Sequence, residues 1–259
     1  MELQKQLKVT KNKIMKVVIL AGGLGTRLFE ITKTIPKPMV RIGKYPILIH
    51  IINHYANFGA KDFFIAAGYK SNIIKKYFKN YKKNSSPFEA NILGKNCNIT
   101  IVDTGKKSLT GGRLKRIEKY LKNEKNFMFT YGDGICDVNI EKLKKFHLKN
   151  NKLITVTSVR PPARFGEIIL KNNIVKSFKE KPQVTNGWIN GGFFVAKTAF
   201  FKFIKNDLEI LEKNPLEKAC KKKQLIAFKH KGFWKCMDVK RDKDELEKIY
   251  KSNNFNWKY

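Results

Sequence analysis

The sequence has few acidic residues, few arginines and no long hydrophobic run. Its 259 residues include 54 lysines and arginines but only 21 aspartates and glutamates, which gives a formal net charge of +33 at pH 7. Only seven of the basic residues are arginine, and the lysines are scattered along the whole chain. Because arginine contacts bases and phosphates better than lysine does, this pattern disfavours nucleic acid as the specific partner. No apolar run approaches the roughly 18 residues of a membrane span, so we expect no membrane partner.

Targeting, redox and nucleophile signals are also missing. Residues 1–14 are polar and lysine-rich without an apolar segment, so we interpret them as a frayed extension rather than a signal peptide. The cysteines show no metal-ligand spacing, and reduced thiols in the cytoplasm are the simplest interpretation. The histidines are isolated from one another and from serine or cysteine motifs, so we interpret them as core or surface residues. These residues are Cys97, Cys136, Cys220 and Cys236, and His50, His54, His147 and His230.

Apolar runs alternate with helical patterns along most of the chain. Hydrophobic residues make up 42% of the sequence, which is enough for a sizeable core. The alternation predicts an α/β fold, a doubly wound, Rossmann-like, mixed but mostly parallel sheet with right-handed crossovers. We expect a single domain over 15–259, with a small appended C-terminal region from about 215. The expected strands are 17–20, 62–67, 98–102, 127–131, 153–159, 188–196 and 224–229; the expected helices are 46–58, 73–81, 110–121, 215–222 and 242–251; 82–96 is expected to be a loop, and 167–178 a hairpin.

The stretch from 15 to 39 carries the clearest chemical signal. A β-branched run at 17–20 ends in the glycine-rich segment GGLGTR at 22–27. Glycines after a strand let backbone N–H groups approach a phosphate, and Arg27 adds a planar cation. Lys37 follows between two prolines, which present it from a stiff segment. The pattern is neither the dinucleotide fingerprint nor a Walker A loop.

Two later segments could lie at the same edge of the sheet. Thr110 begins a predicted helix with two glycines and Arg113, which favours a second phosphate or base contact, although a merely basic helix start is also possible. Asp133 stands between two glycines at the carboxyl end of the strand 127–131, where open α/β sheets bind ligands. A carboxylate there suits magnesium, and a simple Asp-Gly turn is the alternative. Asp137 precedes a predicted helix, and we interpret it as a cap or an outer-sphere group.

Residues 15–259 resemble the glucose-1-phosphate cytidylyltransferases, a family of sugar-phosphate nucleotidyltransferases. The resemblance rests on many short segments that occur in order and at family-like spacing. These are LAGGLGTR at 20–27, PKPM at 36–39, VDTG at 102–105, LTGGRLKR at 109–116, TYGDG at 130–134, PPARFG at 161–166, EKP at 180–182, INGGFF at 189–194 and GFWKCMD at 232–238.

The resemblance implies roles for particular residues. Arg27 and Lys37 would neutralise the triphosphate and take part in catalysis, and Asp133 and Asp238 would bind Mg²⁺. The implied nucleotide-binding residues are Leu20, Ala21, Gly22, Gly23, Leu24, Gly25, Thr26, Arg27, Lys37, Ser108, Arg113 and Gly132, and the implied sugar-phosphate-binding residues are Glu180, Lys181, Asn190 and Gly191.

The implied reaction joins CTP to glucose 1-phosphate and makes CDP-glucose, a precursor for polysaccharide biosynthesis. Because sugar phosphates are ionised near neutral pH, no general base is required. The same fold with UTP or dTTP and another sugar is an alternative, and a non-catalytic nucleotide-binding subunit is another. The resemblance also implies a homo-oligomer, but the segment 82–97 is shorter than the usual insertion, which leaves the oligomeric state open.

Overall fold

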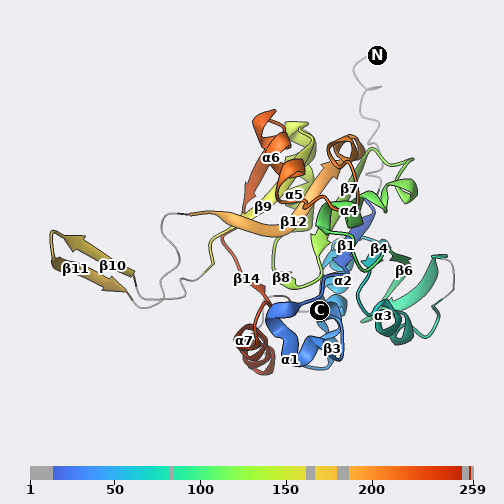
Figure 1. The fold of residues 1–259 in the computed structure, drawn as a ribbon, viewed down its shortest axis with the longest axis horizontal. Helices are drawn as coiled ribbons and strands as arrows, with labels where there is room; N and C mark the ends of the chain where they lie inside the picture. The colour runs from blue at the N-terminus through green and yellow to red at the C-terminus, as the bar shows by residue number, and fades with distance from the viewer. Residues whose placement is uncertain (1–13, 82–84, 162–166, 180–186, 253–256, 258–259) are drawn as a thin grey trace, which may run out of the picture.

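The computed structural model describes residues 14–81, 85–161, 167–179, 187–252 and 257. In this part of the chain, eight strands form a central sheet in the order β13-β9-β12-β7-β1-β4-β6-β5 (Figure 1). The strands are β1 (Val17–Ala21), β4 (Asp62–Ala67), β5 (Phe88–Ile92), β6 (Lys95–Asp103), β7 (Asn126–Tyr131), β9 (Ile154–Val159), β12 (Ile189–Lys197) and β13 (Leu225–Lys229).

The pairing within this sheet is mixed and mostly parallel. The neighbours β7, β1, β4 and β6 run parallel to one another, as do β13 and β9, whereas β12 and β5 are antiparallel to their neighbours. The predicted fold class is therefore confirmed. Helices α1 (Phe29–Thr32), α2 (Ile47–Asn57), α3 (Ser71–Tyr77), α4 (Thr110–Lys115), α5 (Ile140–Asn150), α6 (Asn214–Lys221) and α7 (Lys240–Lys251) accompany it.

The apolar run in β1 is continuous because both of its faces are covered. Val17 and Ile19 belong to one buried cluster, and Val18 and Leu20 belong to a second cluster on the other face. Helix α2 supplies much of the first cluster, while residues after α4 contribute to the second. A strand buried on two sides needs apolar residues at every position, which is why the sequence predicts it so clearly.

One predicted loop is wrong, and two predicted helices are present but end earlier than predicted. The segment 82–96 contains β5 and the start of β6 rather than only a loop, and a tight turn with positive φ at Leu93 (51°) and Gly94 (86°) joins them. The helix predicted over 73–81 is α3, which ends at Tyr77. The helix predicted over 110–121 stops at Lys115 and continues as the 3-10 turn η3 (Glu118–Tyr120).

Smaller ladders and a projecting hairpin complete the described structure. β10 (Glu167–Lys171) and β11 (Ile174–Lys179) form the predicted antiparallel hairpin, which extends away from the rest of the molecule (Figure 1). β2 (Arg41–Ile42) pairs with β3 (Tyr45–Pro46), and β8 (Gly134–Cys136) pairs with β14 (Trp234–Cys236).

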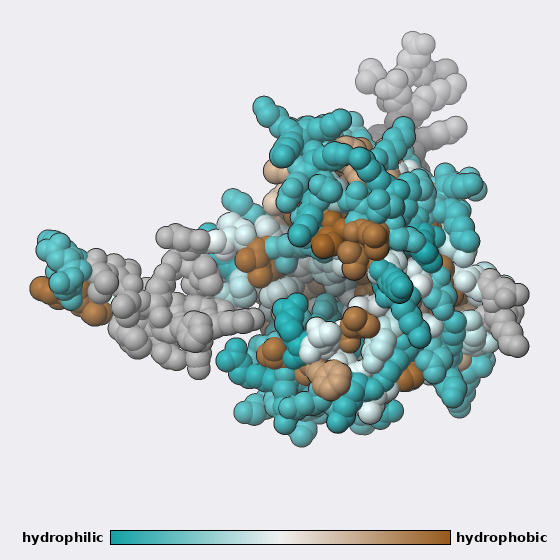
Figure 2. All heavy atoms as spheres, in the orientation of Figure 1, coloured by the Kyte–Doolittle hydropathy of each residue, from teal (hydrophilic) through white to brown (hydrophobic). Residues whose placement is uncertain are grey.

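The distribution of polar side chains agrees with the composition. Hydrophilic residues dominate the face seen in Figure 2, with apolar side chains confined to small groups. Among the described helices, none is long and apolar enough to cross a membrane. Residues 1–13 of the predicted N-terminal extension lie outside the described residues.

Candidate active site

Asp133 and Asp238 are brought together by the short ladder of β8 and β14. In this antiparallel pair Cys236 lies opposite Gly134, so the residues just before β8 and just after β14 are neighbours. The N–H of Met237 donates to the Asp133 carbonyl at 2.8 Å, which extends the ladder by one step. The Asp238 N–H donates to Asp242 at the start of α7, which fixes the backbone on that side. Two distant segments thus present their carboxylates at one end of one ladder.

Lys37 lies between the two carboxylates. Its Nζ is 2.7 Å from Asp133 Oδ2 and 2.6 Å from Asp238 Oδ1. Arg27 donates through Nη1 to the other oxygen of the second carboxylate, Asp238 Oδ2, at 2.5 Å. The two aspartate oxygens that accept from Lys37 Nζ are therefore no farther apart than the sum of these two hydrogen-bond distances. Four predicted residues from four different segments form one cluster.

The backbone around Lys37 explains how it reaches this position. It begins the 3-10 turn η2 (Lys37–Met39) directly after Pro36, which is extended, and Pro38 occupies the next position. The Lys37 side chain is only 13% exposed. Burial alone would lower the pKa of Lys37, but the carboxylates of Asp133 and Asp238 outweigh burial, and the pKa lies above its ordinary value. Lys37 is therefore a cation at neutral pH.

The glycine-rich loop crosses the carboxyl end of β1 beside this cluster. Leu20 and Ala21 are buried strand residues, whereas Gly23, Leu24 and Thr26 are exposed. Gly25 has a φ of 67°, a left-handed conformation that glycine adopts without strain, and it leads into the 3-10 turn η1 (Thr26–Leu28) that carries Arg27. The exposed part of the loop leaves room for a ligand at the end of the sheet, as expected for a phosphate loop.

Gly132 has no room for a side chain. A Cβ there would lie 2.9 Å from the Leu20 carbonyl oxygen and 3.0 Å from Pro38 Cγ. Its N–H donates to the same Leu20 carbonyl at 3.0 Å. Gly132 therefore lets the segment before Asp133 pass close to both the loop strand and the segment that holds Lys37.

Arg113 and Ser108 lie beneath the loop and make internal contacts. The Arg113 guanidinium donates to Thr104 Oγ1 at 2.5 Å, to the Ser108 carbonyl at 2.7 Å and to the Ala67 carbonyl at 3.2 Å. It also packs so tightly against Gly22 that a Cβ on this glycine would overlap it. Burial lowers the pKa of Arg113 to about 10. These contacts tie the ends of β4 and β6 to the base of the loop; contact of Arg113 and Ser108 with a nucleotide stays a prediction.

Amides at the start of α4 are occupied by the protein itself. The N–H groups of Gly111 and Gly112 donate to the Glu209 carbonyl at 2.9 and 3.2 Å. Leu109 donates in the same way to the Asp207 carbonyl at 2.8 Å. The segment 207–212 thus caps this helix, a connection for which the sequence holds no local signal.

A second polar group lies where β7 ends and β12 begins. Asn190 donates through Nδ2 to the Tyr131 hydroxyl at 3.1 Å, and Tyr131 donates to Glu212. Burial first, and then Glu212, raise the pKa of Tyr131. Gly191 accepts a bond from Trp234 Nε1 at 2.7 Å, which links β12 to β14. Sequence reasoning named Asn190 and Gly191 but missed Tyr131 and Glu212; Tyr131 belongs to the TYGDG segment, whereas Glu212 lies outside every motif.

Glu180 and Lys181, the other residues predicted for the sugar phosphate, lie outside the described residues. Arg164 of the PPARFG segment lies outside them as well.

Asp133 and Asp238 form a donor set that suits Mg²⁺. Mg²⁺ prefers hard oxygen ligands, and it usually keeps several waters while one or two carboxylates bind it. The Lys37 ammonium lies between these two carboxylates, so a positive charge of the protein itself already occupies the position beside both of them. The residues fit the predicted ion, and Mg²⁺ binding stays a prediction.

Two interpretations are wrong in part, the cap role of Asp137 and the isolation of His230, while an outer-sphere role of Asp137 stays a prediction. Asn139, not Asp137, caps α5, and its side chain accepts from the Lys142 N–H at 2.9 Å. His230 is not isolated, because its Nε2 lies 2.7 Å from Asp137 Oδ1. His54 and His147 are buried core residues, as predicted, and burial lowers the pKa of each to about 4.

Comparison with known proteins identifies the family. The model of the nucleotidyl transferase family matches residues 16–239. The chain belongs to the nucleotidyl transferase family. It is 44% identical over 254 residues to the glucose-1-phosphate cytidylyltransferase of Salmonella typhimurium, covering 94% of this chain and 99% of that protein. A probable glucose-1-phosphate cytidylyltransferase of Bacillus subtilis is 36% identical with the same coverage. The mannose-1-phosphate guanyltransferase of Yarrowia lipolytica is 32% identical, with 90% of this chain and 62% of that protein covered.

Solved structures of other proteins share the fold. HddC from Yersinia pseudotuberculosis matches with a TM-score of 0.69 at 24% identity, covering 91% of this chain and 99% of that one. A UDP-glucose pyrophosphorylase in complex with UDP-glucose matches with a TM-score of 0.69 at 20% identity, covering 93% of this chain and 100% of that one. At these identities the likeness concerns the fold alone.

Proposed function

We propose that the protein transfers a cytidylyl group from CTP to glucose 1-phosphate, producing CDP-glucose and pyrophosphate. The observation that carries this proposal is the convergence of Arg27, Lys37, Asp133 and Asp238 in one cluster at the carboxyl edge of the sheet. The likeness to cytidylyltransferases over nearly the full length of both chains supports the choice of CTP and glucose 1-phosphate.

In the proposed reaction an oxygen of the sugar phosphate attacks the α-phosphorus of CTP. The new phosphorus–oxygen bond forms as the bond to the β-phosphate breaks, and pyrophosphate leaves with that electron pair. The attacking oxygen is already ionised, so no proton must be removed. The protein therefore has to hold two anions together and stabilise the charge that moves to the leaving group.

Arg27 and Lys37 are suited to that electrostatic task. Arg27 is largely exposed at the mouth of the loop, with 71% of its side chain accessible, so it can meet an arriving triphosphate. Lys37 is buried beside both carboxylates and stays protonated. We propose that Arg27 binds the triphosphate and that Lys37 stabilises charge near the reacting phosphate. Mg²⁺, held by Asp133 and Asp238, would supply further neutralisation of the phosphates when bound.

Asn190 and Gly191 fit a role beside the sugar. They lie at the start of β12, and the Asn190 amide is oriented by its bonds to Tyr131 and to the Gly192 N–H at 2.8 Å. A polar side chain held from both sides can offer donors at fixed positions to sugar hydroxyls. We propose that this end of β12 contacts glucose 1-phosphate, together with Glu180 and Lys181.

The experiment that tests the proposal is a substrate matrix. Release of pyrophosphate is measured with CTP, UTP, dTTP, GTP and ATP, each against glucose 1-phosphate and mannose 1-phosphate. We expect CTP with glucose 1-phosphate to give the highest kcat/KM. A higher value with UTP or dTTP would refute the base assignment, and no turnover with any pair would leave the non-catalytic alternative.

Variants of the carboxylates test the site itself. Asp133→Asn and Asp238→Asn should each lower kcat by roughly 100-fold or more, since each removes an anionic group from the cluster. Asp244→Asn, an exposed residue of α7, is the matched control and should retain activity. Unchanged turnover in the first two variants would exclude their catalytic role. The homo-oligomeric state and the cytoplasmic location stay predictions.

A further inference from the structure

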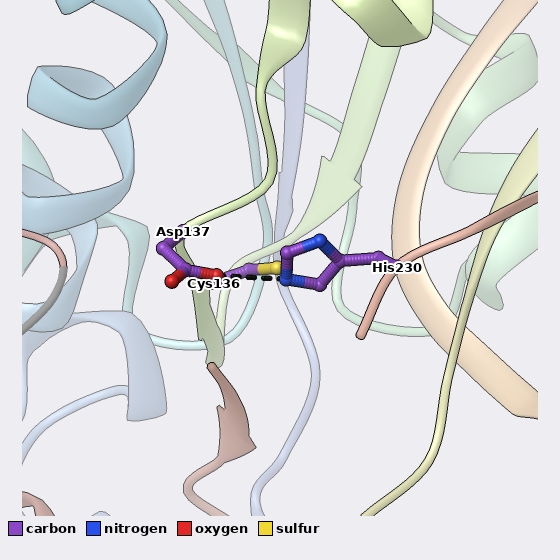
Figure 3. Close-up of side chains that lie close together, drawn as sticks. All are labelled: Cys136, Asp137 and His230. Atoms are coloured by element: carbon purple, nitrogen blue, oxygen red, sulfur yellow. Dashed lines mark ion pairs between the residues drawn. The ribbon is translucent and has the colours of Figure 1, made fainter. Parts of the chain in front are cut away.

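Three side chains of different chemistry meet at the far end of the β8–β14 ladder. Cys136 is the last residue of β8, Asp137 follows it, and His230 comes from the segment between β13 and β14 (Figure 3). One possible ligand atom from each residue lies within 4.8 Å of the others. Figure 3 shows the Asp137 carboxylate and the His230 ring approaching each other from separate segments, with the Cys136 sulfur beside them.

The cluster is partly buried and only partly satisfied by hydrogen bonds. The Cys136 side chain is buried, and Asp137 Oδ1 is buried without a well-aligned hydrogen bond even though His230 Nε2 lies 2.7 Å away. A Cβ on Gly232 would lie 2.5 Å from Asp137 Oδ1, so the absence of a side chain there leaves room for this approach. A buried carboxylate oxygen with an imidazole and a thiol close by lacks a geometrically ideal partner within the protein.

We propose that Cys136, Asp137 and His230 form a binding site for a borderline-soft divalent cation such as Zn²⁺. Thiolate, imidazole and carboxylate together are typical Zn²⁺ ligands, whereas Mg²⁺ and Ca²⁺ prefer oxygen alone. In a tetrahedral Zn²⁺ site, neighbouring ligand atoms are about 3.3–3.8 Å apart. The ligand atoms here lie within 4.8 Å of one another, so side-chain displacements of about 1 Å would bring them to these separations. Water would complete the coordination. Binding replaces the thiol proton, which leaves to solvent, while the imidazole binds in its neutral form.

Sequence spacing alone cannot show this site. Cys136 and Asp137 are adjacent, but His230 is remote in the chain, and the cysteines have no paired spacing of the kind that marks a zinc motif. The ladder creates the proximity, because Asp137 lies opposite Phe233, whose carbonyl accepts from the Asp137 N–H at 3.1 Å. The backbone N–H of His230 in turn donates to the Ser158 carbonyl at 2.9 Å, and this bond anchors the His230 backbone to the end of β9.

The position of the site implies a structural role. A cation bound there would join the end of β13 in the main sheet to the β8–β14 ladder. Asp133 begins the same ladder, four residues before Asp137, which is roughly 13 Å along an extended strand. The proposed cation would therefore stabilise the element that sets the spacing of Asp133 and Asp238, without touching the substrates.

Titration of the chelator-treated 259-residue chain with Co²⁺ tests the proposal. We expect a thiolate-to-cobalt charge-transfer absorption that saturates near one equivalent and that Zn²⁺, but not excess Mg²⁺, abolishes. Both Cys136→Ser and the smaller Cys136→Ala should remove this absorption. Asp137→Asn and His230→Ala should weaken Co²⁺ binding by about tenfold or more.

Matched controls separate this site from other thiols and from the proposed active site. Cys220→Ser on α6 and Cys236→Ser on β14 should keep the absorption. Asp133→Asn should lose turnover but keep the absorption, so a failure of the cytidylyl transfer proposal is distinguishable from a failure of this one. Zn²⁺ should also raise the midpoint temperature of unfolding in the unaltered protein but not in folded Cys136→Ala. An absent thiolate band, or an equal band in the Cys136 variants, would show that the cluster is an Asp–His pair beside an inert thiol.

Discussion

Replacing Lys37 by methionine should strengthen Mg²⁺ binding while it weakens catalysis. The Lys37 ammonium lies within 2.7 Å of both carboxylates, where the ion is expected to bind. At an effective dielectric constant of about 20, each such pair has a Coulomb energy of about 6 kcal/mol, most of which desolvation offsets. The net contribution of a hydrogen bond to a charged group is about 1.5–3 kcal/mol of stability. If about 2 kcal/mol of this must be given up when Mg²⁺ binds, Lys37→Met should tighten Mg²⁺ binding by about 30-fold.

Isothermal titration calorimetry of the substrate-free protein measures the affinity, and pyrophosphate release measures turnover. We expect kcat to fall by roughly 100-fold, because the lysine also stabilises the reacting phosphate. Opposite changes in affinity and turnover are not produced by partial unfolding. Lys235→Met is the matched control, because Lys235 lies on β14 but pairs with Asp242 and Glu245 instead.

An unchanged or weaker affinity in folded Lys37→Met would refute this reasoning. It would mean that the lysine and the ion do not compete for Asp133 and Asp238, and that Mg²⁺ binds elsewhere or only together with the nucleotide. A similar tightening in Lys235→Met would mean that the effect reflects the general excess of positive charge.

Further expectations concern stability. Gly132→Ala should lower the free energy of unfolding by about 1–3 kcal/mol and also reduce kcat, because the new Cβ would lie 2.9 Å from a carbonyl oxygen. Gly134→Ala, whose Cβ would meet nothing closer than 4.0 Å, is the control, and equal losses in urea denaturation would contradict the steric argument. Arg113→Lys should cost about 3 kcal/mol, since it breaks several buried bonds at the ends of two strands; an unchanged urea midpoint would contradict this. His54 and His147 have pKa values of about 4 when folded, below the unfolded value of 6.5. Their contribution to the free energy of unfolding is therefore fully present above pH 6.5 and is lost as the pH falls toward 4. Urea denaturation at a series of pH values should show a loss of about 1.4 kcal/mol per pH unit for each histidine, and a flat profile would oppose it.

The central strands could be predicted from the sequence because burial on two faces demands long apolar runs. β4 has the predicted bounds, and β1 and β7 differ from them by a single residue. β5 was missed because it is an edge strand whose polar residues alternate with Phe88, Ala90 and Ile92, and only its first and last residues are buried. Short alternating edge strands carry a weak signal, and a polar segment with proline and glycine favours the loop interpretation.

The candidate site could be predicted in its members but not in its contacts. The motifs named Arg27, Lys37, Asp133 and Asp238, yet nothing in the sequence indicated that one lysine would bridge the two aspartates. That contact depends on β8 and β14, which have three residues each and show no period that could identify them. For Arg113 the motif predicts a contact with the nucleotide, whereas in the structure its guanidinium donates hydrogen bonds to carbonyl groups of the protein.

The register of the β8–β14 ladder is the feature on which both proposed sites depend. Cys236 opposite Gly134 places Asp238 beside Asp133, and Trp234 opposite Cys136 places the segment from His230 beside Asp137. A slip of one residue would turn every side chain of β14 to the other face, and would separate the members of both clusters at once. Trp234 opposes such a slip, because its Nε1–H is bonded to the Gly191 carbonyl of β12 at 2.7 Å. Trp234→Phe should therefore lower turnover and the proposed Co²⁺ affinity together, whereas loss of only one of them would show that the two ends of the ladder are positioned independently.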